Sequence, residues 1–594
     1  MAKPRSSSRS RPGSGAAKRS TAPKKAQRGG AARGKAAPAG GARARATKAP
    51  ARTPKTVSLP VAPSDGTVAF VSLGCPKNLV DSEKMLGLLV EDGHTPVAYD
   101  VVDDGGAVET VVVNTCGFLE ASKDESLAVI HDAIKRKEQG QVGRVVVAGC
   151  LVQRHRAKML EWAPGIDAMV GVFDRDRITE AVRGTKNLAG RARANIAASP
   201  DQPKYWINAN ALTAADERGM KTIGLTVNGK DGKGVGYFED DRTRLRLTPR
   251  HYAYLRISEG CNQNCAFCTI PSIRGKMRSK PLDALTAEAR ELIADGAVEL
   301  HLIGQDTTSY GDDIGIGMDA GVGLPGMLKA VSGAFDELSV GEGWVRLMYA
   351  YPSNFSDACI DAIAGTPRVL KYIDMPLQHA STRMLQSMRR HITREHTEAL
   401  LEKLRSRIPG IAIRTTFISG FPGETEQDHR ELVDFVREQK FSAVGVFEYS
   451  REPGTRAGTM EADPALAVPA EVKARRRDEV MAAQQEVAFA ANRALAEQFD
   501  EHRPATTGVR MDVLIDQATG SAGRATAGVG QGGRLYQGRT FAQAPSIDSV
   551  TYVQSRKALA PGEVVRCTIV GFDGYDLVAK PTDELEKRVG LKVL

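Results

Sequence analysis

Beyond residue 66, short Val-rich apolar runs alternate with longer segments in which apolar residues recur every three to four positions. The apolar runs predict strands, and the longer segments predict amphipathic helices. The strand candidates are Val68–Leu73, Thr110–Val113 and Arg144–Ala148, and the helix candidates are Leu79–Leu89 and Ser122–Lys137. Val-rich strands separated by helices favour a doubly wound α/β domain with a parallel sheet over residues 65–184.

The same texture returns from Tyr252 onward and repeats six times. The strand candidates are Tyr252–Ile257, Glu299–Ile303, Val345–Tyr349, Tyr372–Asp374, Ile411–Phe417 and Ala443–Phe447. Helical patterns lie between them, at Leu285–Ile293, Arg394–Leu404 and Gln427–Gln439. Six βα units predict a partial (βα)6 barrel over residues 248–485, with any active site at the carboxyl ends of its strands.

The last part of the chain changes to short strands punctuated by glycine. A charged helical stretch, Glu471–Gln498, leads into strand candidates at Val509–Ile515, Gly532–Gly538, Ser549–Val553, Val564–Val570 and Tyr575–Val578. This pattern predicts a small antiparallel β-barrel over residues 486–582, followed by a C-terminal extension at 583–594. The segment has few aromatic residues for base stacking, so it could bind either nucleic acid or protein. The fold class is therefore α/β multidomain.

Charge is concentrated at the start of the chain. Residues 1–64 hold 16 of the 81 lysines and arginines and no acidic residue, so the remaining chain carries −6 of the formal net charge of +10. This segment lacks large apolar residues, and we expect a disordered tail that serves as a solubiliser or as an arm for RNA or the ribosome. Residues 185–247 are mixed, and we expect a linker or insertion with about one hairpin. No apolar run is long enough for a membrane helix, so we expect a cytoplasmic protein. We also expect a monomer.

Six of the eight cysteines fall into two sets of three. Cys261, Cys265 and Cys268 lie four and three residues apart at the end of a predicted strand. Thiolates are soft ligands that suit iron–sulfur clusters, zinc or Cu(I). Three ligands would leave one iron of a cubane open to a small molecule. The two remaining cysteines, Cys359 and Cys567, have apolar neighbours and are interpreted as small buried hydrophobes.

The other set, Cys75, Cys116 and Cys150, follows three strands of the first predicted domain directly. Ligands of doubly wound sheets bind outside the carboxyl ends of the strands, so these thiols should meet at one edge. Three unrelated buried cysteines are the alternative. In the predicted barrel, polar groups at Gly304-Gln-Asp306, Gln378-His379 and Ser419-Gly-Phe-Pro-Gly-Glu424 also follow strands. Several such strand ends suggest a single pocket.

Cys261-x-x-x-Cys265-x-x-Cys268, followed by Ile270-Pro271 and Arg274-Gly275, resembles the radical S-adenosylmethionine enzymes. Together with the first three cysteines and the terminal barrel, it resembles the methylthiotransferases over about residues 65 to 582, which makes the barrel TRAM-like. One branch of this family modifies adenosine in tRNA, and the other modifies an aspartate of small-subunit ribosomal protein S-twelve.

Four stretches resemble the ribosomal-protein branch more than the tRNA branch. They are Gly74-Cys-Pro-Lys-Asn-Leu-Val-Asp-Ser-Glu83, Asn114-Thr-Cys-Gly-Phe-Leu-Glu120, Pro376-Leu-Gln-His-Ala-Ser381 and Ala542-Gln-Ala-Pro-Ser-Ile-Asp548. The tRNA enzymes usually carry Gln-Met-Asn after the first cysteine, and tend to have Ser-Val or Ala-Val after the second. A tRNA methylthiotransferase remains the nearest alternative, and a non-enzymatic iron–sulfur protein that binds RNA or transfers electrons is a more distant one.

The resemblance implies two 4Fe-4S clusters and S-adenosylmethionine as cofactors. Cys261, Cys265 and Cys268 would hold the cluster that binds S-adenosylmethionine and generates a radical, and Cys75, Cys116 and Cys150 would hold the cluster that supplies sulfur. The product would be an aspartate methylthiolated at its β-carbon. We expect Phe267 to contact adenine and Gln305, Ser419 and Glu424 to line the ribose or methionine pocket, with no catalytic residue beyond the cluster ligands. Expected partners are the small ribosomal subunit, with contact to rRNA, and an electron donor such as flavodoxin or ferredoxin.

Overall fold

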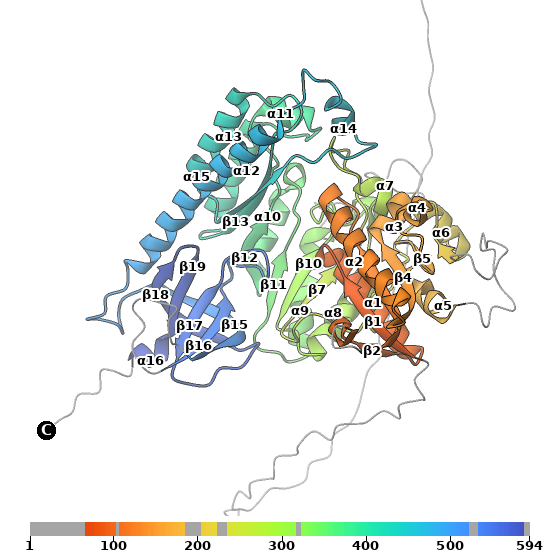
Figure 1. Cartoon of the computed structure of the whole chain (residues 1–594). Coiled ribbons are helices and arrows are strands. Elements are labelled where there is room, and N and C mark those ends of the chain that lie inside the picture. Colours follow the sequence, from red (N-terminus) through yellow and green to blue (C-terminus); the bar gives the residue numbers. More distant parts are fainter. Residues whose placement is uncertain are drawn as a thin grey trace, which may run out of the picture. The chain divides into compact units, whose positions relative to one another are not determined.

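A computed structural model describes residues 66–102, 106–184, 204–221, 234–316, 322–521 and 533–586 (Figure 1). The expected basic tail lies outside these residues, and so does the end of the expected C-terminal extension, 587–594. No helix within the described ranges is long and apolar enough to cross a membrane.

The first domain is a six-stranded parallel sheet in the order β2-β1-β3-β4-β5-β6. The strands are β1 (Thr67–Ser72), β2 (Thr95–Val97), β3 (Val108–Thr115), β4 (Val142–Gly149), β5 (Ala168–Val170) and β6 (Lys204–Trp206). The helices are α1 (Pro76–Glu91), α2 (Glu120–Glu138), α3 (Cys150–His155), α4 (Lys158–Trp162), α5 (Ile178–Arg183) and α6 (Ala211–Glu217). This confirms the doubly wound α/β domain.

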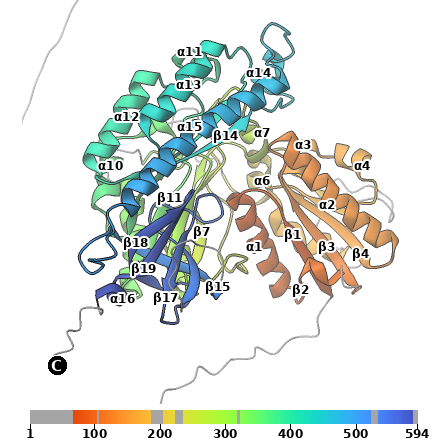
Figure 2. The ribbon, with the colours of Figure 1, turned by 60° about the vertical axis from the view of Figure 1, so that its left-hand side comes forward.

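Both faces of this sheet are covered by helices (Figure 2). Buried residues of α2, α3 and α4 pack with one set of strand side chains, and those of α1 and α5 pack with the other set. Strands covered on both faces are apolar throughout, which explains the Val-rich runs in the sequence.

Part of the segment expected to be a linker completes this sheet. Residues 204–206 pair in parallel with β5 as β6, and residues 211–217 form α6. Neither 204–221 nor 234–247 contains the expected hairpin, and the rest of 185–247 lies outside the described residues. A three-residue strand is too short to show a period in the sequence, so the pattern could not indicate it.

The second domain is an open parallel sheet in the order β14-β13-β12-β11-β10-β7, which confirms the partial (βα)6 barrel. Its strands are β7 (Tyr252–Arg256), β10 (Glu299–Ile303), β11 (Trp344–Leu347), β12 (Val369–Asp374), β13 (Ala412–Ser419) and β14 (Ala443–Glu448). Its main helices are α8 (Leu282–Ala294), α9 (Leu324–Glu337), α10 (Asp357–Gly365), α12 (Arg394–Arg407) and α13 (Glu426–Gln439). Shorter elements are β8 (Ser258–Glu259), α7 (Ile270–Arg274), β9 (Arg278–Ser279), α11 (Thr382–Ser387) and α14 (Arg456–Met460).

Five strands form a closed barrel at the end of the chain, in the order β15-β16-β17-β19-β18. They are β15 (Arg510–Ser521), β16 (Arg534–Arg539), β17 (Thr551–Ser555), β18 (Val564–Asp573) and β19 (Asp576–Pro581), and α16 (Thr582–Glu586) follows. Four pairings are antiparallel, but β17 and β19 run parallel, which corrects the expectation of a wholly antiparallel barrel. An odd number of strands cannot alternate in direction around a closed ring, so one pairing must be parallel.

The long helix α15 (Ala470–Ala496) joins the last two domains (Figure 1). Val480 and Ala483 are buried in the core of the second domain. Near the other end of the helix, Asn492 Nδ2 donates hydrogen bonds to the carbonyls of Gly574 and Tyr575 in the β18–β19 turn. Residue 485, where the sequence placed a boundary between domains, lies inside this helix.

Candidate functional site

The second trio, Cys261, Cys265 and Cys268, lies in the loop between β8 and α7, at the carboxyl end of β7. Gly260 precedes it with φ +79°, and an added Cβ there would lie 2.3 Å from the carbonyl oxygen of Lys276, so only glycine fits this turn. The backbone amides of Gln263 and Ile270 each lie 3.4 Å from the sulfur of Cys261 and Cys268, respectively. Burial raises the pKa of the Cys268 thiol to about 12 and raises that of Cys261 as well.

The first trio, Cys75, Cys116 and Cys150, lies at three adjoining strand ends, as predicted. Cys75 precedes α1, Cys116 follows β3, and Cys150 is the first residue of α3. A Cβ on Gly74 would lie 2.7 Å from the Cβ of Cys116, so the first two loops are in close contact. Burial acts to raise the pKa of Cys75, but the charges of Lys77 and Arg274 outweigh it and lower the pKa below its ordinary value.

The spacing of the thiols fits a body larger than a single ion. Four sulfurs around one zinc at about 2.3 Å lie about 3.8 Å from one another. Among the described residues, we find one group of three His, Cys, Asp or Glu side chains whose ligand atoms all lie within 4.8 Å of one another. It consists of Glu426, His429 and Glu479. In each trio at least one pair of sulfurs is therefore more than 4.8 Å apart, and three soft thiolate ligands are a set that suits an iron–sulfur cluster.

One buried arginine lies between the two trios. Arg274 ends α7, six residues after Cys268, and its Nη2 donates to the Cys150 sulfur of the first trio at 3.3 Å. The same guanidinium pairs with Glu259 and Asp81, both at 2.9 Å. Arg274 belongs to the Arg274-Gly275 pair that follows the cysteine motif in the sequence, and that pattern alone predicts no role for it. Its contacts join the strand-end loop of one domain to the loop of the other.

A second arginine was missed altogether by sequence reasoning. Arg390 is buried, and its Nη1 lies 3.6 Å from the sulfur of Cys265. Its Nη2 donates to the carbonyl of Pro376 at 2.6 Å, and its guanidinium stacks over the ring of Tyr351 at 4.0 Å. No pattern around Arg390 distinguishes it from a surface arginine, because its neighbours come from distant parts of the chain.

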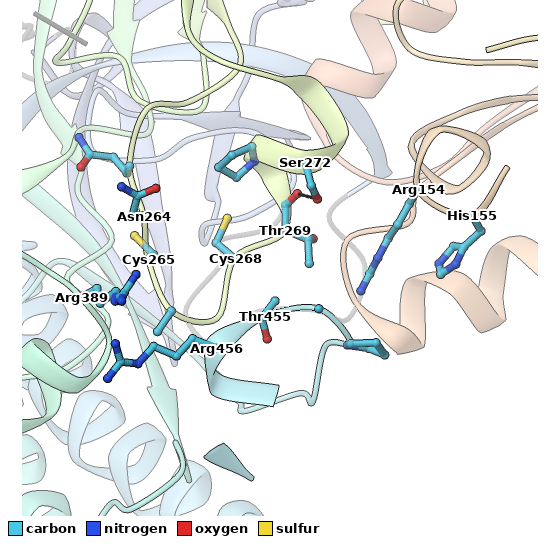
Figure 3. A pocket seen from close by; sticks show the side chains of 15 residues that line it. Arg154, His155, Asn264, Cys265, Cys268, Thr269, Ser272, Arg389, Thr455 and Arg456 are labelled. Atoms are coloured by element: carbon cyan, nitrogen blue, oxygen red, sulfur yellow. Dashed lines mark hydrogen bonds between the residues drawn. The ribbon is translucent and has the colours of Figure 1, made fainter. Parts of the chain in front are cut away.

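A cavity of about 610 Å³ opens beside Cys265 and Cys268. Figure 3 shows Arg389 and Arg456 on one side of these cysteines and Arg154 and His155, from the end of α3, on the other. Since α3 begins with Cys150, one short helix leads from the first trio to this cavity. Burial, together with the nearby charges of Arg154 and Lys123, lowers the pKa of His155 to about 4, so its imidazole is neutral at pH 7.

The cavity wall also ties the domains together. Arg154 Nη1 pairs with Glu452 Oε2 at 2.8 Å, and the other carboxylate oxygen accepts the backbone amide of Glu120 at 3.1 Å. Glu452 is 1% exposed, so this pair is shielded from water. The barrel segment after β14 is thereby fixed to the first domain.

The four weaker candidates lie in different settings. Phe267 is partly buried against an apolar cluster that includes Phe421 and Tyr449. Gln305 Nε2 donates to Glu259 Oε1 at 2.7 Å, and its buried Oε1 has no hydrogen-bond partner among the described residues.

The other two candidates bond within the protein. Ser419 Oγ donates to the carbonyl of Lys473 at 3.1 Å. Glu424 Oε2 accepts the backbone amides of Gly420 and Phe421, and its Oε1 faces Arg476 Nη1 at 3.5 Å. Their contact with a cofactor stays a prediction. Cys359 and Cys567 are both 0% exposed, which confirms their role as buried hydrophobes.

Comparison with known proteins agrees with this arrangement. Three family descriptions match: "Radical SAM superfamily" over residues 255–436, "Uncharacterized protein family UPF0004" over 67–171 and "TRAM domain" over 507–581. Among solved structures, a radical S-adenosylmethionine methyltransferase, TsrM, from Kitasatospora setae is 15% identical, with a TM-score of 0.46, and the match covers 73% of this chain and 86% of that one. A likeness this distant carries no argument about function.

The curated relatives are much closer. The ribosomal protein uS12 methylthiotransferase RimO of Anaeromyxobacter sp. (strain K) is 40% identical over 511 residues, which are 86% of this chain and 92% of that protein. The RimO of Symbiobacterium thermophilum is 38% identical over 537 residues, 89% of this chain and 94% of that protein. The uS12 protein is the S-twelve protein of the small subunit. The chain therefore belongs to the family of ribosomal protein uS12 methylthiotransferases.

Proposed function

We propose that this chain is a radical S-adenosylmethionine methylthiotransferase that adds a methylthio group to the β-carbon of an aspartate in uS12. One observation carries the proposal: a buried arginine of the second domain, Arg274, donates to Cys150 of the first trio and pairs with Glu259, two residues before Cys261 of the second trio. A transfer of this kind needs hydrogen abstraction and sulfur donation at the same carbon, so two sites must act together. Membership of the uS12 family supports the choice of substrate.

Cys75, Cys116 and Cys150 would hold one 4Fe-4S cluster, and Cys261, Cys265 and Cys268 would hold the other. When bound, the clusters and S-adenosylmethionine supply a one-electron cleavage of the sulfonium and the sulfur that is transferred. The chain's own residues orient these groups. Arg274 and Arg390 place a positive charge beside one sulfur of each trio, where a ligating thiolate would carry its negative charge.

Of the expected contacts to S-adenosylmethionine, Gln305 has the best support. Its buried Oε1 lacks a hydrogen-bond partner among the described residues, so this oxygen is available to a polar group of the cofactor. We also infer that Phe267 contacts the adenine and that Ser419 and Glu424 line the ribose or methionine pocket. For the last two, the hydrogen bonds inside the protein would set the shape of the turn around the cofactor.

Iron analysis of anaerobically reconstituted protein tests the two-site proposal. The wild type should hold about eight irons per chain, and the variant with Cys261, Cys265 and Cys268 all changed to alanine should hold about four. The matched variant at Cys75, Cys116 and Cys150 should also hold about four. Loss of all iron from either triple variant, or zinc in the wild type, would contradict it.

Substrate choice is tested with the same reconstituted protein. With S-adenosylmethionine and a reductant, mass spectrometry should find one methylthio group added to uS12 and none added to tRNA. Methylthiolation of tRNA would contradict this proposal and would indicate the tRNA-modifying branch of the family.

We further infer a cytoplasmic monomer that receives electrons from a flavodoxin or ferredoxin and approaches the ribosome through rRNA. The TRAM domain match and the basic residues 1–64 support the rRNA contact. Removing residues 1–64 should flatten the salt dependence of ribosome binding, because fewer counterions are released.

A further inference from the structure

Lys77 is a buried lysine that has neither a hydrogen-bond partner nor a carboxylate partner among the described residues. It is the second residue of α1, two positions after Cys75, and it is 8% exposed. Its Nζ lies 3.3 Å from the centre of the Tyr349 ring, and it makes no hydrogen bond or ion pair with any described residue. Every other buried lysine and arginine in the described part of the chain donates a hydrogen bond to an oxygen.

The carboxylates nearest to Lys77 are already engaged. Glu259 accepts from Arg256, Arg274 and Gln305. Asp374 pairs with Arg414 Nη1 at 2.7 Å and accepts the backbone amide of Tyr349 at 3.2 Å. The arginine charge around the first trio therefore has carboxylate partners within the protein, whereas Lys77 pairs with no carboxylate of the described residues. The opposite charge that acts on it most strongly is the thiolate of Cys75, a candidate cluster ligand.

Tyr349 holds Lys77 in place at the mouth of the barrel. It follows the end of β11 and adopts φ +58°, a left-handed conformation that is uncommon for a large side chain. Strain of this kind collects at functional sites, where the surrounding structure enforces it. Here the backbone bond to Asp374 fixes the residue, and its ring lies under the Lys77 ammonium. A side chain of the first domain is thus set over the carboxyl ends of the barrel strands.

We propose that Lys77 binds the side-chain carboxylate of the substrate aspartate. The inference rests on the proposed function, in which the reacting β-carbon is bonded directly to the carboxyl carbon. The carboxylate is therefore attached to the carbon that receives sulfur. It must lie close to the Cys75 trio when the substrate is bound. A carboxylate that leaves water needs an opposite charge. Lys77 supplies it beside Cys75 and fixes which side chain can enter the site.

A purely structural role makes a different prediction. If Lys77 only balanced the charge of the Cys75 thiolate, its loss would lower the iron content but would not change the choice between aspartate and asparagine. Discrimination between these two substrates is therefore the decisive measurement.

The experiment uses reconstituted holoenzyme and two fluorescent peptides. One carries the uS12 loop with its target aspartate, and the other carries asparagine at that position. Fluorescence anisotropy gives the affinity of each peptide for the wild type, Lys77→Met and Lys135→Met. Lys135 is an exposed lysine of α2 in the same domain, so its variant controls for loss of one charge. Methionine keeps the length and bulk of the lysine chain.

The wild type and Lys135→Met should bind the aspartate peptide about tenfold or more tighter than the asparagine peptide, the effect of one charge-assisted hydrogen bond. Lys77→Met should bind both peptides with the same affinity. Retention of the wild-type preference by Lys77→Met at wild-type iron content would overturn the inference.

A second variant covers a failure of Lys77→Met to fold or to hold iron. Lys77→Arg keeps the positive charge, and it should keep the preference for the aspartate peptide. Equal binding of the two peptides by this variant would reject the inference.

The proposed function and the role of Lys77 can fail separately. If the wild type adds no methylthio group to the aspartate peptide, the proposed function is wrong. If it does so but Lys77→Met still discriminates, only the role of Lys77 is wrong.

Discussion

Single residues set the electrostatics of the two cysteine trios. Arg274 lies against Cys150 and Arg390 lies against Cys265, so each trio has one guanidinium beside one of its sulfurs. Burial outweighs the nearby arginine charges and raises the pKa of Cys150 to about 12, and that of Cys268 to about 12 as well, which would keep these thiols protonated at pH 7. The nearby cations act in the opposite direction, towards the thiolates that metal ligation requires.

Asp312 is a residue at which a pH dependence can be measured. Burial, together with the charges of Asp306 and Asp313, raises its pKa from 3.8 to about 6. The folded state then holds this proton more tightly than the unfolded state, so stability falls as the pH rises from about 4 to 6. Because the side chain is only partly buried, the effect should be about 1–2 kcal/mol.

Asp312→Asn cannot ionise and should be more stable than the wild type by that amount at pH 7. The difference should vanish below about pH 4, where the wild type is protonated in both states. Thermal unfolding across this pH range gives the comparison, with the exposed Asp124→Asn as control. A difference that is independent of pH would show that ionisation of Asp312 is not its cause.

At the scale of elements, the loop after β16 fixes the terminal barrel to the open sheet. Ala544 and Leu514 of the terminal barrel are buried with Tyr254, Trp344 and Met348 of the open sheet. Farther along this loop, Asp548 accepts hydrogen bonds from Tyr372 Oη at 2.9 Å and from Arg414 Nε at 3.1 Å. The family-like stretch at 542–548 therefore performs a packing role between two domains.

Asp548→Ala should weaken this attachment. It leaves Tyr372 without its acceptor and Arg414 with only Asp374, so the free energy of unfolding should fall by about 2–3 kcal/mol. Denaturant unfolding measures the change. Asp573→Ala, at an exposed position of the same barrel, should change stability by less than about 0.5 kcal/mol. Equal effects of the two substitutions would argue against the packing role.

At the scale of the whole molecule, a buried ionic network joins the first two domains. Asp241 lies in the segment between them, is 1% exposed and accepts from Arg175 at 2.8 Å and from Lys280 at 2.8 Å. Arg256 of β7 donates to the same carboxylate and to Asp81 of α1. Although burial acts to raise the pKa of Asp241, these cations hold it well below its ordinary value. The carboxylate is therefore ionised at neutral pH.

Asp241→Asn should loosen this junction. Removing one partner from a buried network leaves cations without their counter-charge and costs about 3–5 kcal/mol. Calorimetry should show a lower melting temperature and separate transitions for the two domains. The neighbouring Asp240→Asn, at an exposed position, should leave the melting temperature close to that of the wild type. A single unchanged transition in Asp241→Asn would exclude a role in docking.

Much of the fold could be read from the chain because its signals are local. Period, length and glycine placement indicated all six strands of the open barrel and the five of the terminal barrel. The two cysteine trios were equally visible, since one lies within eight residues and the other follows strands that a parallel sheet must bring to one edge. Residue type was sufficient to predict a metal site here, because sets of three cysteines with this spacing seldom occur for another reason.

Only the tertiary structure decided how these parts meet. The place of β6 in the sheet, the contact of Arg390 with Cys265, and the position of Lys77 over Tyr349 all join segments that are far apart in sequence. Their formation depends on burial and on competition among charges, which no local pattern records. The sequence by itself therefore determined the ligands and the order of the domains. Packing decided which arginine faces each trio, and it left Lys77 at the mouth of the barrel without a carboxylate partner among the described residues.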